Sequence, residues 1–278
     1  MPFPFADVST APLTELLSLR GRRAVVTGGA RGLGRAVAAR LAEAGADVLL
    51  ADLELALAEQ AAAELSAAHG TRVLAAPVDV ADPASVDDAA ALAVRGLGGL
   101  DIWVNNAGVF PAFGVLQASD EQWRRVHAVN LDGTFHGARA AARHFATSDG
   151  GVIVNIVSTA GFRAPAPGLA AYVVSKHAVR GLTKELALEL APLGVRVLGV
   201  APTYVPTEGN LAAAEAGRAQ AEAAGVDHEQ AGMDVMTHSL IGRLGTPDDI
   251  ARVVLFAVSD LSLIMTGSTL LADAGETL

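Results

Sequence analysis

The stretch TGGARGLG, residues 27–34, is the part of this chain that decides its fold. It joins a β-branched apolar run, residues 23–27, to a segment, residues 32–44, whose apolar side chains recur at helical spacing. Glycines at a strand-to-helix turn let the backbone approach a pyrophosphate, and the free N–H groups of the helix bind it. A glycine-rich turn can also bind nothing, but the strand before it and the helix after it favour phosphate binding. The residues that we expect to contact the phosphates are Gly28, Arg31, Gly32, Leu33 and Gly34.

Outward from this turn, apolar runs alternate with helical segments along the chain. Further strands are expected at residues 47–51, 72–78, 100–105, 151–157, 195–201 and 269–271. Helices are expected at residues 53–68, 84–97, 120–146, 170–190 and 247–258. The strands are near-continuous apolar runs, which is typical of a parallel sheet covered on both faces. The fold class predicted from this pattern is therefore α/β.

The chain divides into a short extension and one long periodic region. Residues 1–20 are broken up by Pro2, Pro4 and Pro12, whereas no linker interrupts the residues that follow. We therefore expect an N-terminal extension at 1–20 and a single domain at 21–278. Within that domain an Ala-rich segment at about 205–240 is expected to be helical and to close over the substrate.

Composition narrows the classes of function. The chain has 278 residues, of which 51% are apolar, and its formal net charge is −10. Proteins that bind nucleic acids or anionic membranes usually carry a surplus of Lys and Arg, and this chain has an excess of acidic residues instead. Neither partner is therefore expected. The absence of cysteine excludes thiolate metal sites, and no histidine has a partner at metal-ligand spacing, so no metal is expected. The sequence shows no export signal or spanning segment, which makes the cytoplasm the expected location.

A carboxylate follows the second expected strand. Asp52 can accept hydrogen bonds from both ribose hydroxyls of an adenosine there, and it would repel a 2′-phosphate. Its neighbours, Leu53 among them, offer no cation for that phosphate, which favours NAD as the cofactor over NADP. Arg31 in the glycine turn is the opposing signal, because its guanidinium can reach a 2′-phosphate.

Two rare residues stand four positions apart on an expected helix. The chain has two tyrosines and two lysines, and Tyr172 and Lys176 share one helix face. A phenol with a pKa of about 10 is a poor base, but a nearby ammonium favours the phenolate, as does the positive nicotinamide ring of an oxidised cofactor. Tyr172 can then accept the hydroxyl proton of an alcohol while hydride leaves its carbon. A packed tyrosine and a surface lysine are the alternative, but this chain uses Arg for nearly all its other positive charge.

Taken together, these patterns resemble the short-chain dehydrogenase/reductase family, in its single-domain branch. TGGARGLG is similar to the family's TGxxxGxG, residues 105–108 read NNAG, and residues 172–176 match YxxxK. The resemblance covers nearly everything from Arg22 to the C-terminus. It implies a Rossmann-like, doubly wound parallel sheet of seven strands in the order 3-2-1-4-5-6-7, with helices on both faces.

The resemblance also implies a role for each site residue. Asn130, Ser158, Tyr172 and Lys176 match the catalytic residues: Ser158 would hold the reacting oxygen, and Asn130 would position water that links Lys176 to solvent. Lys176 would also bond the nicotinamide ribose. The resemblance implies cofactor contacts in addition to the glycine turn, Asp52 and Leu53. These are Asp79 and Val80 at the adenine, Asn106, Ala107 and Gly108 along the cleft, Tyr172 and Lys176 on their shared helix, and Pro202, Val205 and Thr207 at the carboxamide.

Three positions depart from the family pattern. Thr203 stands where a glycine usually follows Pro202, and residues 273–275 read DAG in place of DGG. Ser158 precedes Tyr172 by one residue more than the commonest separation. None of these changes removes a catalytic group.

The function implied is hydride transfer between NAD(H) and a secondary alcohol or ketone. Residues expected in the substrate wall are Val109, Phe110, Phe113, Thr159, Phe162, Arg163, Tyr204, Leu211, Met233 and Met236. This wall is mainly apolar, although Arg163 either meets an anionic group or lies at the surface. Tyr204 either lines the pocket or packs within its own loop. The family also implies a homotetramer paired through the long helices.

Other functions are compatible with the same fold. One is a catalytically silent, nucleotide-sensing protein, which the presence of both Tyr172 and Lys176 disfavours. Another is epimerisation or dehydration of a nucleotide sugar, but the stretch after Thr207 is short for a further substrate domain. An enoyl reductase usually spaces its Tyr and Lys more widely.

Overall fold

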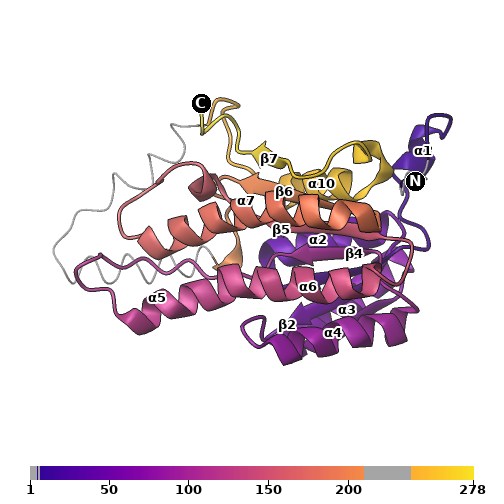
Figure 1. Cartoon of the computed structure of the whole chain (residues 1–278), viewed down its shortest axis with the longest axis horizontal. Helices are drawn as coiled ribbons and strands as arrows, with labels where there is room; N and C mark the ends of the chain where they lie inside the picture. The colour runs from indigo at the N-terminus through magenta and orange to yellow at the C-terminus, as the bar shows by residue number, and fades with distance from the viewer. Residues whose placement is uncertain (1–4, 6, 210–238) are drawn as a thin grey trace.

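A seven-stranded parallel sheet forms the centre of the computed structural model, which describes residues 5, 7–209 and 239–278. The strand order is β3-β2-β1-β4-β5-β6-β7, and every neighbouring pair is parallel (Figure 1). This confirms the predicted fold class and strand order. The strands are β1 (Arg23–Thr27), β2 (Asp47–Asp52), β3 (Val73–Pro77), β4 (Ile102–Asn105), β5 (Gly151–Ile156), β6 (Val195–Pro202) and β7 (Thr269–Ala272).

Helices cover both faces of this sheet. The α-helices are α1 (Leu13–Leu16), α2 (Gly32–Glu43), α3 (Leu55–His69), α4 (Pro83–Leu97), α5 (Asp120–His127), α6 (Gly133–Phe145), α7 (Ala170–Leu190) and α10 (Pro247–Val258). Short 3₁₀ turns are η2 (Thr159–Gly161), η3 (Ala191–Leu193) and η4 (Asp260–Ser262), and η1 (Ala128–Asp132) is a π turn. In Figure 1, α6 and α7 run side by side along one face.

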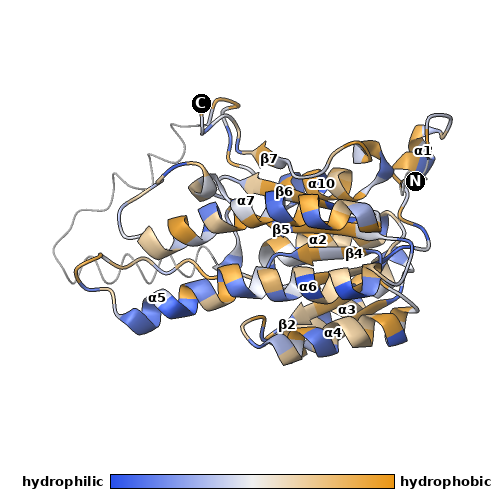
Figure 2. Ribbon diagram, viewed as in Figure 1, coloured by the Kyte–Doolittle hydropathy of each residue, from blue (hydrophilic) through white to orange (hydrophobic). Residues whose placement is uncertain are grey.

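The two faces of the sheet bury alternate residues of the same strand. Ala24 and Val26 pack in a core with α2, α3 and α10, whereas Val25 packs in a second core with α4, α6 and α7. Strand side chains alternate between faces, so a strand buried on both sides is apolar throughout. Figure 2 shows this, with the central strands mostly hydrophobic and α5 mostly hydrophilic.

Local capping sets where the helices begin and end. The side chain of Asp82 accepts the backbone N–H of Ala84 at 3.0 Å and starts α4, and Thr246 forms a capping box with Asp249 at the start of α10. Gly70 and Gly98 end α3 and α4 in the left-handed conformation, which a glycine adopts without strain.

The long helix expected at residues 120–146 is interrupted in the structure. It consists of α5 and α6 with the π turn η1 between them. The hydroxyl of Thr134 donates to the Asn130 carbonyl at 2.7 Å inside this wider turn. Such turns often occur at functional sites, and this one contains Asn130. Apolar periodicity cannot reveal it, because the extra residue leaves the pattern of buried side chains almost unchanged.

The extension expected at residues 1–20 is attached at its end. Leu19 is buried, and its N–H donates to the Ala44 carbonyl at 2.8 Å. Most of the segment expected to close over the substrate, residues 210–238, lies outside the described residues.

Candidate functional site

The expected site residues meet at the carboxyl ends of four adjacent strands. The glycine turn follows β1, Asn106 follows β4, Ser158 follows β5, and Thr203 follows β6. In a doubly wound sheet this edge is where ligands bind. Helix α7 brings Tyr172 and Lys176 to the same edge, since it makes close contacts with η2, directly after Ser158.

The glycine turn forms a cradle that side chains would fill. Gly28 has a φ of +63°, and its N–H donates to the Ala51 carbonyl at 2.7 Å. A Cβ on Gly34 would lie 2.0 Å from the Gly28 carbonyl oxygen. The amide of Asn106 donates to the carbonyls of Thr27 and Gly28, at 2.9 and 3.1 Å. This cradle opens at the N-terminus of α2, and it fits a pyrophosphate.

Thr27 holds the turn against the next loop, a contact that the sequence analysis missed. Its hydroxyl accepts the N–H groups of Asn106 and Ala107, at 3.0 and 3.1 Å. The sequence could have indicated this role, because Thr27 is the first residue of the TGGARGLG motif.

Asp52 lies beside the glycine turn, as expected. Its carboxylate accepts the N–H groups of Ala30 and Glu54, at 2.9 and 3.0 Å. The guanidinium of Arg31 forms an ion pair with Glu54 at 2.8 Å. The cation that was the opposing signal for NADP is therefore paired with the Glu54 carboxylate.

The expected adenine side is formed by the segment after β3. Asp79 accepts the N–H of Ala81 at 2.9 Å, and Val80 is buried. A Cβ on Gly133 would lie 2.8 Å from Val80 Cγ2, so α6 packs tightly on this side. Leu53 is 68% exposed at the rim.

An acidic side chain also reaches the glycine turn from the segment after β6. The N–H of Gly32 donates to the carboxylate of Glu208 at 3.2 Å, and Thr207 lies next to Gly32. The partial positive charge of the helix N-terminus favours an anion at this point. Nothing in the sequence pattern pointed to Glu208, because the contact joins residues far apart in the chain.

Lys176 is buried beside Tyr172. Its Nζ lies 5.7 Å from the centre of the Tyr172 ring and donates to the Ile156 carbonyl at 2.7 Å. Burial lowers the pKa of Lys176 to about 8, because an ammonium loses its hydration there. Tyr172 and Lys176 therefore lie on one face of α7, as their spacing predicts.

Tyr172 departs from the expected electrostatics. Burial raises the pKa of Tyr172, and the hydrogen bond with Ser158 opposes that rise. The lowered pKa predicted from the sequence is therefore not found in the chain by itself. The reason is that burial of the phenol disfavours its charged form, an effect that the spacing of Tyr and Lys does not reveal.

Asn130 joins three parts of the site. Its amide donates to the Val109 carbonyl and accepts the Val109 N–H, each at 2.8 Å. It also donates to the hydroxyl of Ser175 at 3.2 Å, and Ser175 donates to the Tyr172 carbonyl at 2.7 Å. Asn130 thus ties the loop after β4 to α7. Ser175, a residue inside the YVVSK motif, was missed as part of this connection.

A series of hydrogen bonds joins buried polar side chains of the strands and the helix that carry the site. Trp103 Nε1 donates to Asn105 Oδ1 at 2.7 Å, Asn105 donates to Asn155 at 2.9 Å, and Asn155 donates to Thr183 at 3.0 Å. Buried polar groups require such partners, and the chain links β4, β5 and α7. Asn155 was missed, since its role depends on register between two strands.

Comparison with known proteins identifies the family. A sequence model of the short chain dehydrogenase family matches residues 22–217. The chain belongs to this family. A galactitol 2-dehydrogenase (L-tagatose-forming) from Cereibacter sphaeroides is 38% identical over 260 residues, covering 93% of this chain and 96% of that protein. The protein is therefore an oxidoreductase of the short-chain dehydrogenase family.

Solved structures of relatives show the same fold with nicotinamide cofactors. A 3-ketoacyl-(acyl-carrier-protein) reductase from Brucella melitensis, complexed with NADH, has a TM-score of 0.81 and 32% identity, covering 94% of this chain and 100% of that one. A short chain dehydrogenase from Burkholderia cenocepacia J2315, in complex with NADP, has a TM-score of 0.82 and 34% identity, covering 94% and 99%. Relatives of this dehydrogenase thus bind either cofactor.

Part of the expected substrate wall lies next to Tyr172 in this dehydrogenase. The Phe110 ring packs edge-on against Tyr172, with 6.3 Å between ring centres. Phe162 instead packs against the guanidinium of Arg180, 3.9 Å from its ring centre. Arg163 forms an ion pair with Glu276, a partner that the sequence did not suggest. Three expected wall residues lie outside the described residues: Leu211, Met233 and Met236.

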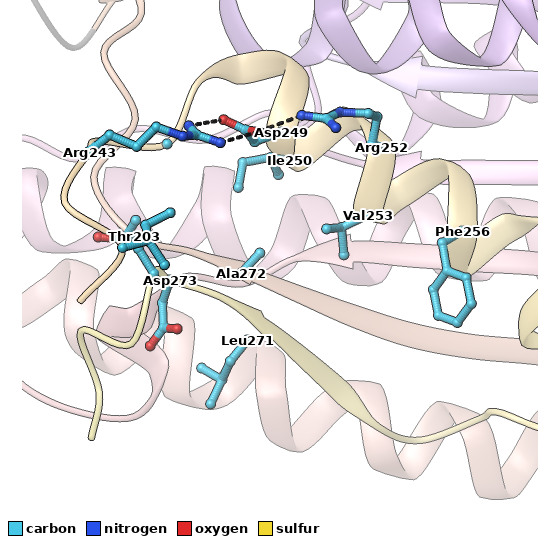
Figure 3. A pocket seen from close by; sticks show the side chains of 13 residues that line it. Thr203, Arg243, Asp249, Ile250, Arg252, Val253, Phe256, Leu271, Ala272 and Asp273 are labelled. Atoms are coloured by element: carbon cyan, nitrogen blue, oxygen red, sulfur yellow. Dashed lines mark hydrogen bonds and ion pairs between the residues drawn. The ribbon is translucent and has the colours of Figure 1, made fainter. Parts of the chain in front are cut away.

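A separate hollow of about 470 Å³ lies between α10 and the end of β7 (Figure 3). Thr203 and Asp273 line its edge, but neither Tyr172 nor Ser158 does. Its two arginines, Arg243 and Arg252, both bond to Asp249. This hollow is therefore distinct from the site around Tyr172.

Two further features concern only the part of the chain that the structure describes. There, no three His, Asp or Glu side chains gather as a metal ion would require. Within the same residues, no helix combines the length and apolar character needed to cross a membrane.

Proposed function

We propose that this protein transfers hydride between NAD(H) and a secondary alcohol or ketone, with Tyr172 as the acid and base. The observation that carries the proposal is the meeting of Tyr172, Ser158 and buried Lys176 at the sheet edge that holds the glycine cradle. A nicotinamide bound there supplies the hydride acceptor or donor. The chain itself has to supply geometry and proton transfer.

In this mechanism each side chain acts at a stated atom. The Tyr172 phenolate accepts the proton of the alcohol oxygen during oxidation, and in reduction the Tyr172 hydroxyl donates that proton to the carbonyl oxygen. The Ser158 hydroxyl donates a hydrogen bond to the same oxygen, where charge develops. The Lys176 ammonium, held by the Ile156 carbonyl, stabilises the Tyr172 phenolate once it forms. Asn130 keeps Val109 and Ser175 in place around them.

The residues present fit a dinucleotide along the strand ends. We infer that the phosphates lie at the glycine turn, the adenosine ribose at Asp52, and the nicotinamide at Pro202, Val205 and Thr207. NAD is favoured because the Arg31 guanidinium is paired with Glu54, and because the Asp52 carboxylate next to the glycine turn would repel a 2′-phosphate.

The proposed substrate is a mainly apolar carbinol. The Phe110 ring lies next to Tyr172, so an apolar group on the carbinol carbon would pack against it. The galactitol 2-dehydrogenase relative is named for oxidation at carbon 2, which supports a secondary alcohol.

The test is a panel of secondary alcohols, 1-phenylethanol among them, assayed with NAD and with NADP by the absorbance of the reduced nicotinamide. We expect turnover with NAD, and we expect Tyr172→Phe to reduce kcat at least about 100-fold with little change in the Kd of NADH. Failure to bind either dinucleotide would contradict the proposal. Binding without turnover of any alcohol would favour the nucleotide-sensing alternative.

We also propose a homotetramer, paired through the long helices. Phe135 on α6 and Leu188 on α7 are 41% and 72% exposed, and partner helices would cover such side chains. Light scattering coupled to size-exclusion chromatography measures the mass directly. A monomer at micromolar concentration would contradict this assembly.

A further inference from the structure

The end of the chain forms a tightly held turn. The Asp273 carboxylate accepts the N–H groups of Gly275 and Thr277, at 3.1 and 3.0 Å, and the Thr277 hydroxyl at 2.6 Å. Ala274 has a φ of +55°, which strains a residue with a Cβ. Such strain persists only where the surroundings impose it, and it often marks a functional segment. The turn therefore presents its next residue, Glu276, in a fixed place.

Glu276 bridges two loops of the candidate site. One carboxylate oxygen accepts a hydrogen bond from the guanidinium of Arg163, and the other accepts a hydrogen bond from the hydroxyl of Thr203. The Glu276 side chain is only 12% exposed, so these charge-assisted hydrogen bonds are shielded from water. Arg163 belongs to the loop that begins at Ser158, whereas Thr203 directly follows Pro202 at the end of β6.

The loop that carries Ser158 is held at its start by the sheet, where the Val157 N–H donates to the Val200 carbonyl at 2.8 Å, and η2 packs against α7. The N–H groups of Gly161, Phe162 and Arg163 all donate to carbonyls within the loop itself, those of Ser158 and Thr159. These local bonds shape the loop but do not fix its distance from β6. Thr203, directly after the last residue of β6, donates its hydroxyl to Glu276 and so connects the second loop to the same carboxylate.

We propose that Glu276 is a positioning residue that holds the Ser158 loop, residues 158–163, at a fixed distance from the loop after β6, residues 202–207. This inference rests on the proposed function for its effect on catalysis, because there the second loop holds the nicotinamide and the first orients the substrate oxygen. A displacement of about 1 Å between reacting groups can cost about 100-fold in rate.

The first experiment needs neither cofactor nor activity. Hydrogen exchange is measured on the full-length protein and on Glu276→Gln, Thr203→Val and the control Glu64→Gln, which removes an exposed ion pair with Arg35 that lies between α2 and α3 and outside both loops. We expect Glu276→Gln to speed amide exchange about tenfold in both loops, Thr203→Val to do so chiefly after β6, and the control to change neither. If Glu276→Gln leaves the amide exchange rate of either loop unchanged, or raises exchange equally throughout the chain, the proposal that Glu276 connects the two loops is overturned. If Glu276→Gln does not fold, Thr203→Val decides the question, since it removes one of the two bonds.

The second experiment tests positioning of the reaction. In Glu276→Gln the Kd of NADH should change less than about threefold, because the glycine turn and Asp52 are untouched. The kcat for 1-phenylethanol should fall about tenfold or more, and the isotope effect with carbinol-deuterated substrate should rise as hydride transfer becomes slower. A loss of stability with an unchanged isotope effect would show a merely structural role and overturn the inference.

The two proposals fail differently. If the wild-type protein binds neither NADH nor NADPH, the proposed function fails, and the exchange experiment still decides whether Glu276 couples the loops. If the wild-type protein turns over 1-phenylethanol and Glu276→Gln does so at the same kcat, only the positioning role fails.

Discussion

At the scale of single residues, the buried ammonium of Lys176 makes stability depend on pH. Its pKa falls from 10.5 to about 8 on burial, so between these values the unfolded chain binds the proton that the folded chain has lost. The free energy of unfolding therefore rises with pH over that window. The raised pKa of Tyr172 acts in the opposite direction, but only above its ordinary value of about 10.

The prediction compares the wild type with Lys176→Met, which removes the titration and keeps most of the volume. The stability of the wild type relative to the variant should rise by about 2 kcal/mol from about pH 8 to about pH 10. Urea unfolding at several pH values measures it, and the comparison cancels the contribution of Tyr172. Parallel pH curves for the two proteins would show that the Lys176 pKa is not lowered.

At the scale of elements, the glycine turn and α2 act as one unit. A Cβ on Gly34 would lie 2.5 Å from the Asn106 amide as well as 2.0 Å from the Gly28 carbonyl. Gly34→Ala should therefore distort the cradle and weaken NADH binding at least about 100-fold, measured by fluorescence titration. The matched control is Gly181→Ala in α7, where nothing lies within 4 Å of the new Cβ. That control should keep NADH affinity and gain about 1 kcal/mol of stability, and equal NADH affinity of both variants would refute the cradle.

The buried Arg196 of β6 connects this strand to α10 and η4. Arg196 is 2% exposed, and its guanidinium donates to the carbonyls of Ala257, Ser259 and Ser262, at 3.0, 3.2 and 3.2 Å. It thus satisfies the carboxyl end of α10 and the turn η4, where a positive charge is favourable.

Replacing this arginine should destabilise the fold. Arg196→Met leaves several buried carbonyls unpaired, so the free energy of unfolding should fall by about 2–4 kcal/mol. Urea denaturation measures the change, and Arg252→Gln on the exposed side of α10 serves as the control. If both variants lose the same small amount, the clamp contributes little.

At the scale of the whole molecule, the fold followed from patterns that act locally. Apolar runs such as residues 23–27, the glycine turn and the helix caps each favour the same alternation of strand and helix, so the parallel sheet was predictable. The closeness of Tyr172 and Lys176 was predictable for a similar reason. Tyr172 and Lys176 lie on one helix, and their spacing alone brings them to one face.

The sequence by itself therefore determined the strand–helix alternation, the glycine turn and the pairing of Tyr172 with Lys176. Tertiary structure alone decided which distant residues touch, namely Glu208 at Gly32, Glu276 at Arg163 and Thr203, and Asn155 at Asn105. It also decided the direction of the Tyr172 pKa, which burial raises. The physical reason is that periodicity and spacing record contacts within a few residues, whereas burial and long-range hydrogen bonds arise only when separate elements pack together.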